Sequence, residues 1–307
     1  MSSNFSEHLA EAQSELHTIR DFLRWTCSRL DEADVFFGHG TDNPWDEAVA
    51  LILPLLRLPY DCPDELMDTR LTTTEKQRLA QAIKQRVVHR VPVAYLTQQA
   101  YFCGLPFYVD ERVLVPRSPI GELIERQFTP WVDPQNVHSV LDLCTGSGCI
   151  AIACAQYFPE AFVAASDIST DALAVAEYNC QLLESEHVCL MQSNLFDKIP
   201  EQQFDVIVSN PPYVDAEDMA DLPDEFRSEP ELGLAAGHDG LDLVHIMLQQ
   251  AHRYLSEHGI LIIEVGNSAG ALEAAYPDFD FNWIEFERGG HGVFVMTAEE
   301  VKQFAKV

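Results

Sequence analysis

Short apolar segments alternate with helical stretches from about residue 135 onward, and this alternation strongly constrains the fold. Five segments rich in β-branched and other apolar residues are predicted to be strands: 138–143, 161–166, 187–192, 204–209 and 259–265. Such an order is typical of a doubly wound α/β domain, in which helices cover both faces of a sheet. The pattern changes at its end, where Gly289-Gly290 joins two more predicted strands, 281–288 and 291–296. We therefore expect a closing hairpin instead of a further strand–helix unit.

A glycine-containing turn follows the first predicted strand in "VLDLCTGSGCIAIACA" (140–155). Gly146 and Gly148 would let the backbone approach a ligand closely at the carboxyl end of that strand. The segment matches neither the GxGxxG dinucleotide motif nor the phosphate-binding P-loop. Asp142 precedes the turn, and Asp167 ends the second predicted strand, where a carboxylate commonly binds the ribose of an adenosine cofactor. The turn alone can serve packing, but together with Asp167 it predicts a nucleoside site.

The first 92 residues contain only helical patterns. Residues 6–30 have helical apolar spacing, and two further helices have clear start signals. Those signals are Asp42 or Asn43 before Pro44, and Thr72 with Glu75 as a capping box; Pro92 marks the end of the last helix. We expect residues 1–95 to form a helical domain without catalytic residues, either a packing module or, as we favour, a substrate-recognition domain.

Residues 96–116 are predicted to form a β-hairpin connector. In "QQAYFCGLPFYVDERVLVP" (98–116), apolar residues alternate around a Gly-Leu-Pro turn. The following stretch, 117–128, has the apolar spacing of a helix. The catalytic domain is expected to span residues 117–307.

The net charge of −30 is unevenly distributed. Residues 131–307 contain six Lys and Arg against thirty Asp and Glu, a balance of −24. Proteins that engage nucleic-acid phosphates need basic side chains, so this charge disfavours DNA and favours a basic partner. Segment 214–231, with eight acids and one arginine, is expected to attract that partner. The alternatives are a solvated loop and a charge that serves only solubility.

Cysteine usage and hydropathy indicate a cytoplasmic protein. Eight cysteines in 307 residues do not indicate a disulfide framework, and Cys144, Cys149 and Cys154 lack the spacing of metal ligands. We interpret them as small core residues and expect no metal. No apolar run reaches the roughly 18–20 residues of a membrane span, and the acidic N-terminus lacks the apolar stretch of a signal peptide.

Three motifs together resemble the S-adenosylmethionine-dependent methyltransferases of the class I Rossmann-like fold: "DLCTGSG" (142–148), Ser166-Asp167 and "NPPY" (210–213). This resemblance implies S-adenosylmethionine as cofactor and a seven-stranded sheet of order 3-2-1-4-5-7-6 that closes with an antiparallel hairpin. The absence of a phosphate-binding loop agrees, since this cofactor has no phosphate. Further segments resemble the HemK-type protein glutamine methyltransferases over nearly the whole chain: "NPWDEA" (43–48), "GLPFYVDERVLVPR" (104–117) and "EPELGLAAGHDGL" (229–241).

NPPY ends the fourth predicted strand and suits methylation of a planar nitrogen. An amide or aromatic amine is a poor nucleophile, because its lone pair is delocalised. The side-chain carbonyl of Asn210 and the backbone carbonyl of Pro211, held by the rigid Pro211-Pro212 unit, would accept its N–H groups and raise electron density on nitrogen. Tyr213 would stack on the flat group. For the tetrapeptide alone, the alternative is a turn that merely closes the strand.

The resemblance also implies roles for further residues. Asp142, Asn210 and the turn would line the cofactor, with Asp167 and Ile168 at the ribose and Leu195 or Asn194 beside the adenine. The turn residues concerned are Cys144, Thr145, Gly146, Ser147 and Gly148. Phe102 would form a wall of the glutamine pocket; its alternative is the core of the hairpin. Glu229 and His291 are polar residues near predicted loop ends, and no role follows for them.

One departure from the family pattern narrows the choice of substrate. Release-factor-modifying members usually carry an Arg-Pro-x-Thr-Glu-type segment where this chain has "PRSPIGELIE" (116–125). That variant resembles the branch that methylates a glutamine of large-subunit ribosomal protein L-three, a basic protein. Glutamine methylation of release factors is the first alternative, and adenine methylation on nucleic acid the second. A non-catalytic module that retains the fold is a third, and the intact Asn210, Asp167 and Gly146 argue against it.

Overall fold

The computed structural model describes residues 2–306 and divides the chain into two compact units. Unit 1 comprises the chain up to Gln99 together with Pro223–Ser228. Unit 2 comprises Ala100–Leu222 and the chain from Glu229 onward. No helix among the residues searched is both long and apolar enough to cross a membrane.

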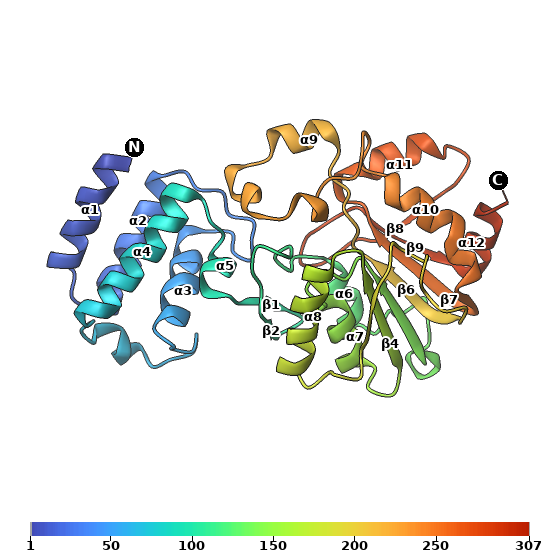
Figure 1. Cartoon of the computed structure of the whole chain (residues 1–307), viewed down its shortest axis with the longest axis horizontal. Helices are drawn as coiled ribbons and strands as arrows, with labels where there is room; N and C mark the ends of the chain where they lie inside the picture. Colours follow the sequence, from blue (N-terminus) through green and yellow to red (C-terminus); the bar gives the residue numbers. More distant parts are fainter. Residues whose placement is uncertain (1, 307) are drawn as a thin grey trace. The chain divides into compact units, whose positions relative to one another are not determined.

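Unit 1 is helical, with one apolar core (Figure 1). Its helices are α1 (Ser2–Glu15), α2 (Ile19–Glu32), α3 (Pro44–Leu55), η1 (Asp64–Asp68), α4 (Thr73–His89) and α5 (Val93–Thr97), with η3 (Asp224–Ser228) from the second half of the chain. Asn43 caps α3, and the Thr72–Glu75 capping box of α4 is present as predicted. The helical spacing over residues 6–30 belongs to two helices, because Thr18 starts a new one with its own capping box.

Unit 2 opens with a short hairpin of β1 (Ala100–Phe102) and β2 (Leu105–Phe107). The expectation of a Gly-Leu-Pro turn was wrong, since Leu105 and Pro106 lie inside the second strand. Cys103 and Gly104 form the turn, with φ of 48° and 74°. Two-residue hairpin turns of this kind need positive φ at both positions, a requirement that proline does not meet.

The main sheet has seven strands in the order β5-β4-β3-β6-β7-β9-β8. They are β3 (Ser139–Leu143), β4 (Phe162–Asp167), β5 (Cys189–Gln192), β6 (Phe204–Ser209), β7 (Leu255–Glu264), β8 (Asn282–Trp283) and β9 (Val293–Thr297). The first five run parallel, and β9 is antiparallel to both β7 and β8. Numbered within the sheet, this is the predicted order 3-2-1-4-5-7-6.

The closing strand pair differs from the predicted hairpin in length. β8 has only two residues, and the strand predicted over 281–288 leaves the sheet early. The backbone N–H groups of Glu287 and Arg288 donate to the carboxylate of Glu122 instead of to a neighbouring strand. Gly289-Gly290 therefore lies in a longer connection.

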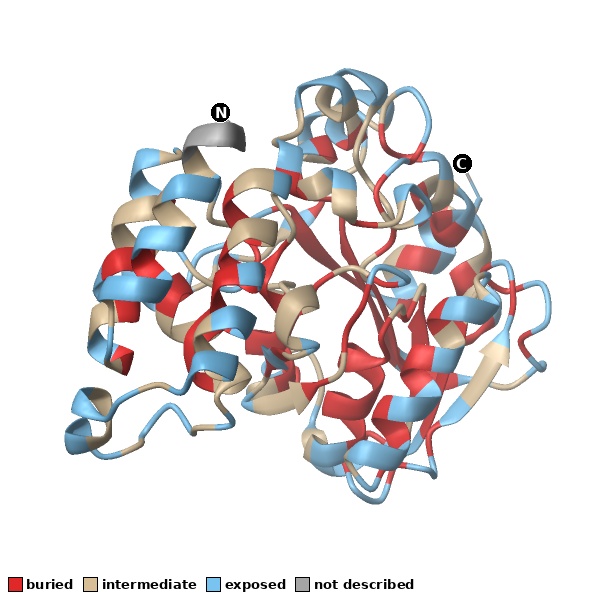
Figure 2. Ribbon diagram, turned by 60° about the vertical axis from the view of Figure 1, so that its left-hand side comes forward, coloured by how far each residue is buried: buried red, intermediate tan, exposed pale blue. Residues whose placement is uncertain are grey.

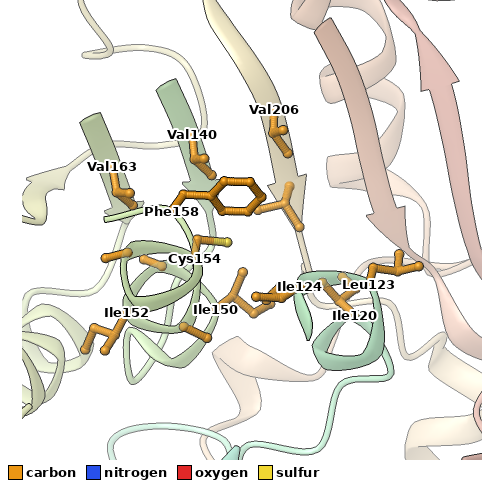
Figure 3. Close-up of a cluster of buried hydrophobic side chains, with 14 of the residues drawn as sticks. Ile120, Leu123, Ile124, Val140, Ile150, Ile152, Cys154, Phe158, Val163 and Val206 are labelled. Carbon is orange, nitrogen blue, oxygen red and sulfur yellow. The ribbon is translucent and has the colours of Figure 1, made fainter. Parts of the chain in front are cut away.

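Helices cover both faces of the sheet, and the strands form its buried centre (Figures 1 and 2). On one face lie α6 (Ile120–Glu125), α7 (Cys149–Tyr157) and α8 (Thr170–Leu182), and Figure 3 shows α6 and α7 directing apolar side chains toward β3, β4 and β6. On the other lie α10 (Asp242–Gln250), α11 (Ala269–Ala275) and α12 (Ala298–Phe304). Within β6, Val206 and Val208 contribute to the first core and Ile207 to the second. Burial of both faces accounts for the continuous apolar runs.

Candidate active site at the carboxyl edge of the sheet

Three sequence motifs meet where β3, β4 and β6 end. Leu143 of β3 pairs with Ser166 of β4 on one side and with Ser209 of β6 on the other. The next residues along the three strands therefore emerge at one edge of the sheet. These are the glycine turn after Leu143, Asp167 after Ser166, and NPPY after Ser209. The hydroxyl of Ser209 donates to the backbone carbonyl of Leu143 at 2.7 Å, which fixes the start of NPPY to the start of the turn.

The glycine turn has left-handed backbone at Cys144, Gly146 and Gly148, with φ of 59°, 55° and 81°. A Cβ added to Gly146 would meet no atom within 4 Å, so the turn is open at this residue. A Cβ added to Gly148 would lie 3.1 Å from the Cβ of Ala176 in α8. Only Gly146 thus faces free space, whereas Gly148 permits close packing of the two helices. Thr145 and Ser147 are buried within the turn.

Asp167 is bound to this turn through its own carboxylate. One oxygen accepts the Gly146 N–H at 2.9 Å, and the other accepts the Ser169 N–H at 2.8 Å. Burial raises the pKa of Asp167, although these backbone N–H groups favour its ionised form. The neighbouring Ile168 is 50% exposed, an unusual state for a large apolar side chain.

Asp142 is fully buried beneath the turn. Its Oδ2 accepts from the Thr145 hydroxyl at 2.5 Å and from the Ala151 N–H at 3.2 Å. Its Oδ1 is a buried oxygen without a hydrogen-bond partner among the described residues. Burial raises the pKa of Asp142 to about 7, and the nearby charge of Asp167 acts in the same direction. A cation close to this edge would stabilise the ionised form of both carboxyl groups.

Asn210 and Pro211 present two carbonyl oxygens that accept no hydrogen bond from the described residues, 2–306. Among residues 2–306, neither the side chain of Asn210 nor the backbone carbonyl of Pro211 takes part in a hydrogen bond. Asn210 is partly exposed, and Pro211 is buried. Buried carbonyl groups are nearly always paired, so an unpaired carbonyl at a strand end is a place where a ligand can donate.

Tyr213 is held on several sides. Its hydroxyl donates to Glu264 Oε1 at 3.0 Å, and its backbone carbonyl accepts from the Ser268 hydroxyl at 2.9 Å. A Cβ on Gly266 would lie 2.5 Å from the tyrosine ring, so only glycine lets the ring pack against the backbone there. The ring of Tyr213 is therefore fixed against Gly266, with its hydroxyl on Glu264.

Glu264, at the end of β7, is a site residue that the sequence analysis missed. It is 4% exposed, and its second oxygen accepts a short hydrogen bond from the Ser118 hydroxyl. Burial raises its pKa to about 7, against the opposing effects of Ser118, Tyr213 and Arg117. The signal that was available is an acid within "GILIIEV" (259–265), at the end of an otherwise apolar strand.

An ion pair between the partly buried Arg117 and the buried Glu229 lies near Glu264. Arg117 donates to both oxygens of Glu229, each at 2.6 Å, and the Val115 N–H donates to Glu229 at 3.0 Å. Glu229, for which the sequence gave no role, is only 6% exposed and joins the end of the connector to the segment after NPPY. His291 bonds to Asn267 through Nε2 at 3.0 Å.

The other predicted site residues, Leu195, Asn194 and Phe102, have no contacts with the glycine turn or NPPY in the hydrogen bonds described above. Leu195 is 5% exposed and belongs to the core beneath α10, whereas Asn194 beside it is exposed. Phe102 is 6% exposed in the core of α6 and α7, where a Cβ on Gly121 would lie 3.1 Å from its ring. This position agrees with the alternative reading of Phe102 as hairpin core. No group of three or more His, Cys, Asp or Glu within residues 2–306 could hold a metal ion.

The sheet order, the open glycine turn and NPPY at one edge define a class I methyltransferase domain. Residues 128–226 match the family model described as "Methyltransferase small domain". The chain is 46% identical over 293 residues to "Ribosomal protein uL3 glutamine methyltransferase" of Francisella tularensis subsp. tularensis, covering 95% of this chain and 93% of that protein. It is 49% identical over 292 residues to the protein of the same name from Xanthomonas campestris pv. campestris, covering 95% of each. The chain belongs to the family of ribosomal protein uL3 glutamine methyltransferases.

A solved structure of the T. thermophilus 16S rRNA N2 G1207 methyltransferase in complex with AdoMet and guanosine is also similar. It is 16% identical, with a TM-score of 0.42 over 65% of this chain and 49% of that chain.

The cofactor is S-adenosylmethionine, and the residues at the strand ends fit it. The turn and the strand ends next to it contain two acids and no lysine or arginine, which suits a cation without phosphates. Gly146 leaves open space, Asp167 offers a carboxylate for a diol, and Ile168 offers exposed apolar surface for a flat ring. The buried Oδ1 of Asp142, which has no hydrogen-bond partner within residues 2–306, is a further acceptor beneath the turn.

Proposed function

We propose that this protein transfers a methyl group from S-adenosylmethionine to the side-chain amide nitrogen of a glutamine in ribosomal protein uL3. The observation that carries the proposal is the pair of unpartnered carbonyl oxygens on Asn210 and Pro211, beside the acidic glycine turn. The two relatives named as uL3 glutamine methyltransferases supply the substrate class.

The chain's own residues activate and orient the glutamine amide. The bound cofactor supplies a methyl group on a positively charged sulfur, which leaves as a neutral thioether. The two N–H groups of the amide donate to Asn210 Oδ1 and Pro211 O, which turns the nitrogen lone pair toward the methyl carbon. Positive charge develops on that nitrogen as the new bond forms, and the two carbonyl dipoles stabilise it. The nitrogen then loses one proton to water, and the fixed ring of Tyr213 covers a face of the flat group.

The proposal assigns a part of the chain to each task. Every candidate site residue lies in unit 2, which supports residues 117–307 as the catalytic domain. The proposed connector, residues 96–116, is divided between the units: residues 96–99 belong to unit 1, and the hairpin from Ala100 onward belongs to unit 2. Residues 1–95 would recognise the substrate. We place the reaction in the cytoplasm, where ribosomal proteins are made.

A direct assay tests the substrate. Labelled S-adenosylmethionine is incubated with the protein and, in separate reactions, with purified uL3, a peptide chain release factor and DNA. Label is expected in uL3. Label in the release factor alone would assign the protein to the other branch of glutamine methyltransferases, and label in DNA alone would contradict glutamine methylation.

The acidic segment 214–231 is only partly available to a basic partner. Glu225 and Glu229 are buried and paired with arginines, so they cannot act as recruiting charges. This corrects the sequence-based picture of eight equivalent acids. The exposed acids of the segment are Glu217, Asp221, Asp224 and Glu231. We propose that these exposed acids attract basic uL3.

We expect the KM for uL3 at low salt to rise about threefold to tenfold when three exposed acids are neutralised together. The substitutions are Glu217→Gln, Asp221→Asn and Glu231→Gln. The KM should also depend less on salt, because exposed charges act through a screened field. A matched control neutralises Glu160, Glu184 and Glu186, which are exposed in loops before β4 and β5, at the opposite edge of the sheet. Equal salt dependence in both triple variants would rule out recruitment by this segment.

The rate of transfer is expected to fall as the pH drops through about 7. In the folded protein the pKa of Glu264 is raised from its ordinary 4.5 to about 7. Glu264 is therefore protonated below pH about 7 and ionised above it. Only the ionised carboxylate of Glu264 accepts hydrogen bonds from both Tyr213 and Ser118. The nearby positive charge of Arg117, which is paired with Glu229, favours this ionised form. Glu264→Gln should lower kcat about tenfold and remove the acidic limb of the kcat–pH profile.

The control for this pH profile is Glu285→Gln, which neutralises an exposed acid after β8. It should keep the acidic limb of the wild-type profile. If Glu264→Gln also keeps that limb, Glu264 does not control the site.

A further inference from the structure

Six residues of the catalytic half belong structurally to the helical unit. Pro223–Ser228 is part of unit 1, although it begins ten residues after the end of NPPY. Both flanks belong to unit 2. On one side, Val214 exchanges backbone hydrogen bonds with Leu234 and Ala236; on the other, Glu229 is held by Arg117. The chain therefore leaves unit 2 after Leu222 and returns to it at Glu229.

Glu225 anchors this segment within the helical unit. It is 3% exposed, and its Oε1 accepts from Arg86 Nη1 and from the Phe36 N–H, both at 3.0 Å. Arg90 Nη1 lies 3.5 Å from the same oxygen. Arg86 is itself 2% exposed, and it also binds Glu47 and the Phe36 carbonyl.

Aromatic packing adds a second, independent contact. The Phe226 ring lies 4.7 Å from the His39 ring and 5.7 Å from the Phe36 ring, measured between centroids. The segment is thus held by a buried charge and by an apolar ring. Losing Glu225 would leave buried Arg86 with Glu47 as its remaining carboxylate, and losing a partner of a buried charge costs more than losing an exposed ion pair.

We propose that the Arg86–Glu225 pair is a positioning device for the substrate-binding loop. It holds Pro223–Ser228 on the helical unit and so restricts the chain ends of the two flanking stretches that carry the exposed acids. Glu225 is a positioning residue and does not touch the reacting atoms. The inference rests on the proposed function, since it assigns the helical unit a part in binding uL3. It gives that unit a second role, as support for a loop of the catalytic half.

The test combines a protease with enzyme kinetics on the full chain. In Glu225→Ala, chymotrypsin should cut after Phe226 at least about ten times faster than in the wild type, because the ring leaves Phe36 and His39 more often. The KM for uL3 should rise about tenfold. The kcat and the affinity for S-adenosylmethionine should stay near the wild-type values, since Asn210, Pro211 and the glycine turn lie outside the segment.

Two further variants serve as a control for charge removal and as a milder change at position 225. Glu160→Ala removes an exposed acid before β4, outside segment 214–231, and should leave both the cleavage rate and the KM close to the wild type. Glu225→Gln keeps an oxygen for Arg86 but loses the charge, and should fall between the wild type and Glu225→Ala even if the alanine variant folds poorly.

The cleavage rate is independent of the substrate assignment. Unchanged cleavage in both Glu225 variants would overturn the anchor itself. Faster cleavage with an unchanged KM for uL3 would overturn its role in substrate binding. If the wild-type protein does not methylate uL3, the proposed function fails, while the cleavage rates still report on the anchor.

Discussion

Replacing Asn210 by alanine is expected to reduce kcat for methylation of uL3 by about 100- to 1000-fold, the usual effect of removing one preorganised polar partner of a transition state. The affinity for S-adenosylmethionine and the stability should change little, because the Asn210 side chain has no hydrogen bond to lose among residues 2–306. The loss should appear in kcat, since the contact strengthens as charge develops on the amide nitrogen.

Single-turnover rates and isothermal titration calorimetry with the cofactor separate these effects for Asn210→Ala. Asn136→Ala is a matched control, because Asn136 precedes β3 and so lies at the opposite edge of the sheet. A variant that keeps its fold but no longer binds S-adenosylmethionine would show that Asn210 serves the cofactor and not the amide.

Replacing Asp167 by alanine is expected to weaken the binding of S-adenosylmethionine by about 10- to 100-fold, the range for losing a hydrogen bond to a charged group. The carboxylate has a double role in this prediction. It offers its oxygens to the ribose hydroxyls, and it already accepts the Gly146 N–H, which shapes the turn. Loss of the side chain therefore removes a ligand contact and loosens the turn.

The ribose role has a specific signature in titration calorimetry. S-adenosylmethionine and its demethylated product carry the same ribose, so Asp167→Ala should weaken both by the same factor. Asp171→Ala, an exposed acid in the first turn of α8, should weaken neither. A loss confined to the positively charged methyl donor would mean that Asp167 acts through its charge and not through the ribose.

The parts of the fold with a local sequence signal were predictable. Parallel strands buried on both faces read as apolar runs, which located β3, β4, β6 and β7. The edge strand β5 was also located, although its residues are exposed or only partly buried. Sheet order came from the resemblance carried by the turn, Asp167 and NPPY, and the sheet has that order. Those same residues do meet at one edge, because residues that follow neighbouring parallel strands must emerge together.

The parts that depend on distant partners were not predictable. Ser118 and Glu264 are 146 residues apart, and Arg117 and Glu229 are 112 apart, so no local pattern links them. Glu225 looked like one more surface acid, because its partner Arg86 is 139 residues away. The hairpin turn was misplaced for a different reason. Proline is a common turn residue, yet the positive φ needed at both turn positions selects Cys103 and Gly104.

The assignment of Pro223–Ser228 to the helical unit also limits how this protein can be divided into fragments or recombined with relatives. A fragment that begins at residue 100 would keep Glu225 and Phe226 but lose Arg86, Phe36 and His39. A fragment that ends at residue 99 would keep Arg86 beside Glu47 and lack its other carboxylate. Dividing the chain between residues 99 and 100 would therefore not yield two complete structural units. An exchange of N-terminal halves between relatives would succeed only where positions 86 and 225 still match, so we expect these two positions to change together.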